Sequence, residues 1–204
     1  MSTQQLSVEE EDERLRAKVN VAYSAVADGP QEKHPFPTGR KLAEELGYPQ
    51  ELLDSLPQVA VEAFAGVSTV SLFSDLRTGA TVLDLGCGAG MDSIIAAQRV
   101  GPSGRVTGVD FSESMVERAQ RAKRLTNLKH LEFYRADAEH LPLESQAVDV
   151  ALVNGIFNLN PNRTQVFSEL SRVLRPGGHA YVAELILAQP LPVSDRASES
   201  NWFA

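Results

Sequence analysis

The feature that most constrains this chain is an apolar stretch that runs into three closely spaced glycines, Thr81-Val82-Leu83-Asp84-Leu85-Gly86-Cys87-Gly88-Ala89-Gly90. The residues before the first glycine have the pattern of a buried strand, and residues 91–100 place apolar side chains at helical spacing. Glycine lacks Cβ, so it suits a sharp turn or a close approach of the backbone to a ligand. A strand, a glycine turn and a helix in this order open many nucleotide-cofactor folds.

The glycine segment departs from the dinucleotide fingerprint G-x-G-x-x-G. With Gly86 and Gly88 as the first two glycines, the fingerprint requires its third glycine at position 91, which is Met91. The third glycine of this chain is Gly90. Asp84 before the turn and Asp92 after it put negative charge where a pyrophosphate would bind. A cationic cofactor with an ammonium and a sulfonium therefore fits better, and a nicotinamide-dependent reductase is the disfavoured alternative.

Length and charge exclude several classes of function. A chain of 204 residues is long enough for one domain with a substantial core. A formal charge of −8 and a pI of about 5.0 disfavour nucleic acid and anionic membrane surfaces as partners. No apolar run approaches the ~20 residues that span a bilayer. The single cysteine, Cys87, cannot form an internal disulfide, so we expect a cytoplasmic protein.

Strand and helix patterns alternate after residue 80, which predicts an α/β fold: a Rossmann-like, doubly wound, mainly parallel sheet. We expect a helical N-terminal cap over residues 1–75 and the cofactor-binding domain over residues 76–204. The expected strands are 81–85, 105–109, 131–135, 147–153 and 179–187, with a turn at 175–178. The expected helices are 15–27, 41–46, 49–56, 91–100, 112–125 and one that starts at 160–161.

Polar residues mark the ends of four successive strands, namely Asp84, Asp110, Asp137 and Asn154. Ligands of open parallel sheets bind outside the carboxyl ends of the strands. Asp84 can anchor the glycine loop or reach an ammonium group, and Asp110 can accept both hydroxyls of a ribose. Each acid alone also fits a helix-flanking or loop position, but the four together predict a cofactor site.

If the cationic cofactor carries an adenosine, further residues would contact it. Asp137 can accept from an adenine amino group, and the backbone N–H of Ala138 can donate to a ring nitrogen. Phe111 and Met115 can flank the adenine. Asn154 ends the fourth strand, close to where a methyl group on the sulfonium would point. We predict no metal ligands.

The glycine segment resembles the first motif of the class I S-adenosylmethionine-dependent methyltransferases, in which this loop cradles the methionine half of the cofactor. The resemblance assigns Gly86, Cys87, Gly88 and Gly90 to cofactor binding. Within the class, the chain is most similar to the arsenite methyltransferase branch, over about residues 40–187. The segments that carry this likeness are Leu46-Gly47-Tyr48-Pro49, Leu56-Pro57, Gly90-Met91-Asp92 and Asn154-Gly155-Ile156-Phe157-Asn158-Leu159-Asn160-Pro161.

The chain departs from that branch in its thiols. The family binds trivalent arsenic through several cysteines, one of which would fall near Phe64-Ala65-Gly66. The only thiol here is Cys87, and one thiol cannot form a three-coordinate arsenic site. Arsenite methylation is therefore the less favoured activity.

The resemblance also implies a sheet of seven strands, but only seventeen residues follow Leu187. They contain two prolines and many polar residues, which do not suit a helix and two strands. We expect a fragment of a longer protein, or a sheet that ends at the fifth strand. An uncovered edge strand invites pairing, so a homodimer through this edge is one expectation.

The leading hypothesis is an enzyme that transfers a methyl group from S-adenosylmethionine to a small molecule. The alternative is a non-catalytic or truncated module that only binds the cofactor. No catalytic residue is assigned; Tyr23 and His34 lie in the segment that covers such sites. The basic run of Arg118, Arg121, Lys123 and Arg124 is interpreted as a solvated helix face.

Overall fold

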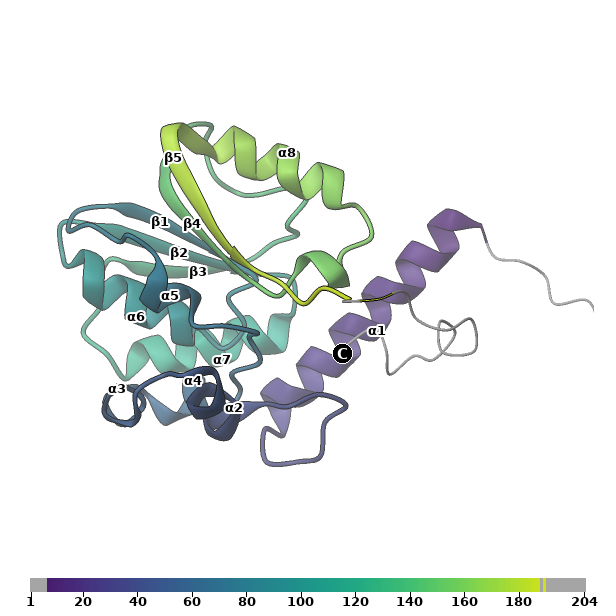
Figure 1. Ribbon diagram of the computed structural model, residues 1–204, viewed down its shortest axis with the longest axis horizontal. Helices are drawn as coiled ribbons and strands as arrows, with labels where there is room; N and C mark the ends of the chain where they lie inside the picture. The colour runs from purple at the N-terminus through teal and green to yellow at the C-terminus, as the bar shows by residue number, and fades with distance from the viewer. Residues whose placement is uncertain (1–6, 188, 190–204) are drawn as a thin grey trace, which may run out of the picture.

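Five parallel strands form one sheet in the order β3-β2-β1-β4-β5. The computed structural model describes residues 7–187 and 189 (Figure 1). The predicted doubly wound α/β fold is confirmed. The strands are β1 Thr81–Leu85, β2 Arg105–Asp110, β3 Leu131–Arg135, β4 Val148–Asn154 and β5 Leu174–Ala183.

Helices cover both faces of the sheet (Figure 1). Helices α6 Met91–Val100 and α7 Glu113–Arg124 pack on one face, and α8 Arg163–Val173 packs on the other. Because side chains alternate along a strand, Val82 of β1 joins the core under α6 and α7, whereas Leu83 joins the core under α8. The strand order reverses between β1 and β4, which is where ligands of such sheets bind.

Five helices lie in the described part of the N-terminal segment, residues 7–75. Helix α1 carries a capping box between Ser7 and Glu10 and runs across the side at which the strands end (Figure 1). The other helices pack into the core under α6 and α7, through buried residues such as Leu53 and Val70. The division at residue 75 stays a prediction. The five helices are α1 Val8–Asp28, α2 Gly39–Leu46, α3 Gln50–Ser55, α4 Gln58–Val61 and α5 Val70–Phe73.

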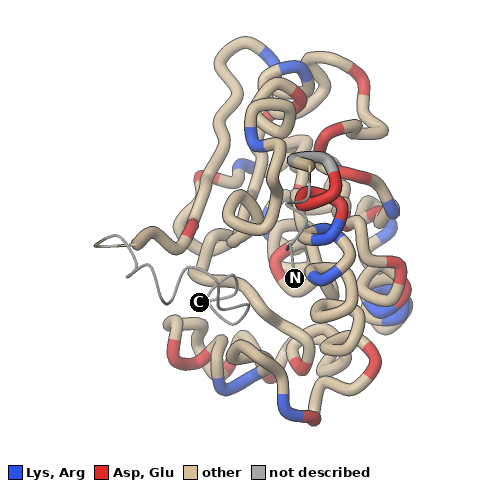
Figure 2. The backbone as a smooth tube through the Cα atoms, turned by 90° about the vertical axis from the view of Figure 1, so that its right-hand side faces the viewer, with Lys and Arg blue, Asp and Glu red and all other residues tan. Residues whose placement is uncertain are grey.

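Charged residues of both signs are interspersed along the chain on the face shown in Figure 2. The net charge of −8 is therefore not gathered into one acidic face in that view. Across residues 7–187, no helix is both long and apolar enough to cross a bilayer.

The edge strand β5 differs from the prediction. It begins at Leu174, not at residue 179, and it ends at Ala183, not at residue 187. Val148 of β4 pairs with Leu174 and Val150 pairs with His179, so residues 175–178 form a bulge where a turn was expected. Gly177 permits the bulge with a φ of 81°. A homodimer through this edge stays a prediction.

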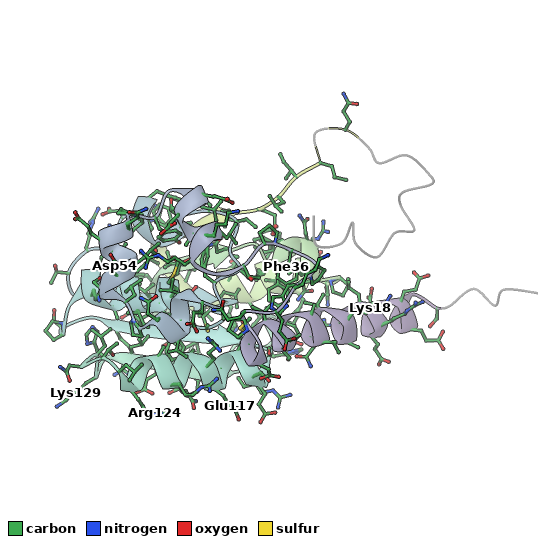
Figure 3. All side chains as sticks on the ribbon, turned by 90° about the horizontal axis from the view of Figure 1, so that it is seen from below. Lys18, Phe36, Asp54, Glu117, Arg124 and Lys129 are labelled. Carbon is green, nitrogen blue, oxygen red and sulfur yellow. The ribbon has the colours of Figure 1, made fainter. Side chains whose placement is uncertain are left out.

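Arg118 is buried, contrary to the interpretation of its basic run as a solvated face. Its guanidinium donates to the carbonyl oxygens of Val59 (2.6 Å) and Ala27 (2.7 Å) and to the carboxylate of Glu62 (2.9 Å). Figure 3 shows Arg124 of the same run pointing outward from α7. Arg118 therefore joins α7 to the end of α1 and to the α4 region.

We expect Arg118→Ala to lower the free energy of unfolding by about 2–4 kcal/mol, because it leaves buried carbonyl groups without donors. Urea denaturation followed by circular dichroism measures the change. The exposed neighbour Arg121 offers a matched control, and Arg121→Ala should change stability by less than about 0.5 kcal/mol. Equal effects of the two substitutions would contradict the role given to Arg118.

Candidate cofactor site

A cavity lies at the carboxyl ends of the strands, and α1 forms part of its wall. Ten of the eleven predicted cofactor residues line it, which are Asp84, Gly86, Cys87, Gly88, Asp110, Phe111, Met115, Asp137, Ala138 and Asn154. They meet there because parallel strands place their carboxyl ends along one edge of the sheet.

Gly90 is the exception, because it does not line the cavity. Its φ is 86°, and a Cβ at this position would lie 2.6 Å from the ring of Phe133. Glycine is needed here so that the start of α6 can pack closely against the sheet. The structure thus gives Gly90 a packing role, and its predicted role in cofactor binding stays a prediction.

The turn itself depends on Gly86 and Gly88, which have φ values of 75° and 51°. A Cβ on Gly86 would collide with Ile156, whereas the nearest atom to a Cβ on Gly88 is the sulfur of Met115 at 3.9 Å. Gly88 therefore has open space beside it. A ligand can approach the backbone closely at this point.

Asp110 holds the turn in place. Its carboxylate accepts the backbone N–H of Gly88 (2.9 Å) and that of Ser112 (2.9 Å), one on each oxygen. Burial raises the pKa of Asp110 despite these donors. A carboxylate has about four lone-pair sites, so Asp110 can still accept a hydroxyl group from a ligand in the cavity.

Two further buried carboxylates, Asp84 and Asp92, lie in the same wall. The hydroxyl of Ser93 donates to Asp84 (2.5 Å), and the hydroxyl of Tyr48 donates to Asp92 (2.6 Å), as does that of Ser71. Burial raises the pKa of both acids, and repulsion by Asp92 raises that of Asp84 further. A cationic ligand would favour their charged forms.

Asn154 lies in the wall, but its amide is committed to the chain. Its oxygen accepts from the N–H groups of Val67 (2.9 Å) and Ser68 (3.1 Å). Its nitrogen donates to the carbonyl of Ser68 (2.8 Å) and to Asp92 (2.9 Å). Asn154 therefore positions residues 67–68 and Asp92, and its contact with a cofactor stays a prediction.

Helix α1 closes the far end of the cavity. Arg16 donates to Asp137 (2.7 Å) and to the buried carboxylate of Glu139. Asp137 also accepts the N–H of Glu139 (3.1 Å). Arg16 therefore covers the predicted adenine position, and the sequence analysis did not identify it as a site residue.

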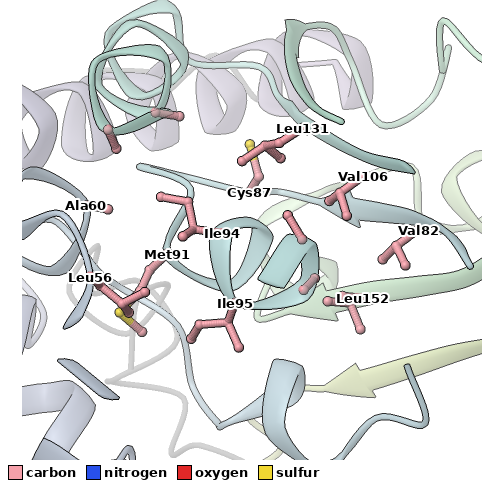
Figure 4. Close-up of a cluster of buried hydrophobic side chains, with 14 of the residues drawn as sticks. Leu56, Ala60, Val82, Cys87, Met91, Ile94, Ile95, Val106, Leu131 and Leu152 are labelled. Carbon is pink, nitrogen blue, oxygen red and sulfur yellow. The ribbon is translucent and has the colours of Figure 1, made fainter. Parts of the chain in front are cut away.

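Cys87 is part of the cavity wall, and its side chain packs into the core. Figure 4 shows its sulfur among buried side chains such as Val106 and Leu131. Burial raises the pKa of this thiol well above its ordinary value, so it stays protonated and unreactive at neutral pH.

Several lining residues were not predicted as cofactor ligands. Phe64, Ala65 and Gly66 line the cavity, and they form the segment singled out as the position of a family cysteine. Tyr23 lines it too, as expected for a residue of the covering segment. The sequence indicated Asp92 only as a negative charge at the start of α6. Its hydrogen bonds with Tyr48 and Ser71 join residues that are distant in sequence, so no local pattern predicts them.

The fold and the site define a class. A parallel sheet of order 3-2-1-4-5, a glycine turn after β1 and an acid at the end of β2 characterise a Rossmann-like, S-adenosylmethionine-dependent methyltransferase. The chain belongs to the family described as a methyltransferase domain, whose model matches residues 76–203. S-adenosylmethionine is the cofactor of this class.

Named relatives support the assignment. An arsenite methyltransferase from Halobacterium salinarum is 36% identical over 150 residues, which are 74% of this chain and 38% of that protein. A demethylmenaquinone methyltransferase from Lactococcus lactis is 37% identical over 132 residues, 64% of this chain and 51% of that protein. The chain therefore spans about half, or less, of these relatives.

A solved structure gives the same result. An arsenic(III) S-adenosylmethionine methyltransferase from Chlamydomonas reinhardtii superposes with a TM-score of 0.60 at 30% identity. The match covers 79% of this chain and 54% of that one. The likeness extends beyond the sheet into the N-terminal helices, since it covers more of the chain than residues 76–203 contain.

We expect Asp110→Ala to weaken the binding of S-adenosylhomocysteine by about 1.5–3 kcal/mol, because the substitution removes charge-assisted hydrogen bonds and the support of Gly88. Isothermal titration calorimetry measures the change. Asp75→Ala, at an exposed acid outside the cavity, is the control. Unchanged affinity would remove Asp110 from the site.

We expect the ligand-free protein to lose stability as pH rises from about 5 to about 8, because raised carboxyl pKa values make the folded state hold protons that the unfolded chain releases. This stabilisation is complete below the ordinary pKa of about 4 and is lost as pH rises through the folded pKa. Asp84→Asn should make the decline shallower, by at most about 1.4 kcal/mol per pH unit. Urea denaturation at several pH values measures both slopes, and identical slopes would contradict the assignment.

Proposed function

We propose that this chain transfers a methyl group from S-adenosylmethionine to a small molecule. The observation that carries the proposal is the cavity at the carboxyl ends of the strands, which gathers a glycine turn and three buried acids, Asp84, Asp92 and Asp110. The relatives named above are methyltransferases, which supports the same activity.

The wall of the cavity offers a partner for each part of the cofactor. Asp110 would accept the ribose hydroxyls, and Asp84 and Asp92 would balance the positive charge of the ammonium and sulfonium groups. Asp137 and the N–H of Ala138 would meet the adenine, with Phe111 and Met115 on its faces. When bound, S-adenosylmethionine supplies a methyl group already activated by its sulfonium.

The work left to the protein is placement and exclusion of water. Helix α1 covers the cavity through Arg16, Val19 and Tyr23, which shields the reacting groups. No base is assigned: the ring Nε2 of His34 bonds the carbonyl of Gly29 (2.9 Å), and that of His130 bonds the carbonyl of Ala97 (2.8 Å). Both rings are therefore engaged in hydrogen bonds with the backbone.

The thiols argue against arsenite as the acceptor, although two of the relatives act on arsenic. Arsenic(III) needs several thiolates, and Cys87 is a buried thiol of the glycine loop. The cavity wall at Phe64-Ala65-Gly66 presents no sulfur. A non-thiophilic acceptor therefore fits this chain better.

Two measurements test the function. Calorimetry should detect binding of S-adenosylhomocysteine and none of NADH, because Asp92 opposes a pyrophosphate at the start of α6. Incubation with S-adenosylmethionine and a panel of small acceptors should release S-adenosylhomocysteine, detected by mass spectrometry. Binding of NADH instead would contradict the proposal, and cofactor binding without turnover on the whole panel would favour the non-catalytic module.

A further inference from the structure

A second cavity adjoins the cofactor cavity. The two share five lining residues, which are Tyr23, Ala65, Gly66, Gly155 and Leu159. Two of the shared residues are glycines in close packing: a Cβ on Gly66 would lie 2.5 Å from Asn154, and one on Gly155 would lie 3.0 Å from Val67. A molecule in the second cavity would therefore lie beside a cofactor in the first.

The second cavity has apolar walls. Phe36, Leu42, Leu46 and Val67 line it, and the N-terminal segment contributes all four. Figure 3 shows Phe36 beside α1, where its ring packs on Tyr23 with the centroids 4.9 Å apart. Among its lining residues in the described part of the chain there is no lysine, arginine, histidine or cysteine.

The polar groups in this wall are mostly occupied by the chain. Glu184 accepts the N–H groups of Phe157 (2.6 Å) and Leu185 (3.1 Å), and the amide of Asn158 donates to the carbonyl of Leu185. An anion entering the cavity would find no cation to balance it, and Glu184 would repel it. A soft metalloid would find no thiolate.

Tyr23 offers a ligand a polar group in the shared wall. Its side chain lies in both walls, and within residues 7–187 its hydroxyl makes no hydrogen bond. Burial raises the pKa of Tyr23, and the charges of Asp110 and Glu184 raise it further. The side chain therefore stays a neutral phenol, which can donate or accept one hydrogen bond.

We propose that the second cavity is the acceptor site and that it takes an uncharged, mainly apolar small molecule whose one polar group meets the hydroxyl of Tyr23. This inference rests on the proposed methyl transfer, since the shared wall places the acceptor beside the cofactor. It makes the N-terminal segment the part of the chain that selects the acceptor.

Fluorescence titration of the full chain, saturated with S-adenosylhomocysteine, tests the inference with 2-naphthol as an uncharged probe and 2-naphthoate as its anionic counterpart. We expect saturable binding of 2-naphthol and at least about tenfold weaker binding of 2-naphthoate, because a charge buried without a partner is costly. Comparable affinity for both probes, or no binding of 2-naphthol, would overturn the proposal.

Variants locate the binding. Leu42→Lys places a charge in the cavity and should weaken 2-naphthol at least about tenfold. Leu125→Lys, at a leucine that is 71% exposed and outside both cavities, should leave it unchanged. Phe36→Ala tests the same wall by truncation if Leu42→Lys does not fold. Equal binding by all variants would overturn the assignment.

Tyr23→Phe tests the polar contact. It should weaken 2-naphthol by about three- to tenfold, the effect of one lost hydrogen bond, and leave naphthalene unchanged. A parallel loss for both probes would show a packing role and overturn the contact. Calorimetric titration of each protein with S-adenosylhomocysteine separates the two proposals. If the unsubstituted chain does not bind S-adenosylhomocysteine, the proposed function fails. If it binds S-adenosylhomocysteine but not 2-naphthol, only the acceptor-site proposal fails.

Discussion

The carboxylate of Asp110 is the contact on which the rest of the site depends. It accepts one backbone N–H from the glycine turn and one from the start of α7, both at 2.9 Å. A loop of glycines has little side-chain packing to hold it, so its shape must come from backbone hydrogen bonds. By fixing Gly88 from β2, Asp110 keeps open the space that a cofactor needs and places α7 for its contacts with the N-terminal helices.

The N-terminal segment is attached to the sheet domain through a few buried polar groups. Arg118 reaches the C-terminal end of α1 and the α4 region, Asn154 holds residues 67–68, and Asp92 accepts a hydrogen bond from Tyr48. Each of these contacts joins residues more than forty positions apart. Apolar packing surrounds them, but directional bonds decide how the cap sits over the cavity, because hydrophobic contact alone has no preferred angle.

The sequence predicted what local patterns determine. Strands 81–85 and 131–135 and the helix 91–100 have the predicted bounds, because apolar periodicity and glycines mark them. The acids at strand ends also met in one cavity, because parallel topology brings strand ends together. The predictions for Arg118 and for the start of β5 were wrong, because long-range contacts determine both. The burial of Arg118 depends on carbonyl groups about sixty and ninety residues away, and the start of β5 depends on its register with β4.

On the proposed assignment of the second cavity, the sheet holds the cofactor and the N-terminal segment selects the acceptor. The acids and glycines that face the cofactor cavity come mainly from the strand ends, whereas the apolar wall of the second cavity comes mainly from residues 36–67. Methyl transfer from an activated donor depends chiefly on how the acceptor is placed, so on this proposal substitutions at residues 36–46 would change the acceptor and leave cofactor binding intact. Ala65 and Gly66 in the shared wall illustrate this, since a cysteine in that segment would offer a thiol to a metalloid, and its absence leaves an apolar surface.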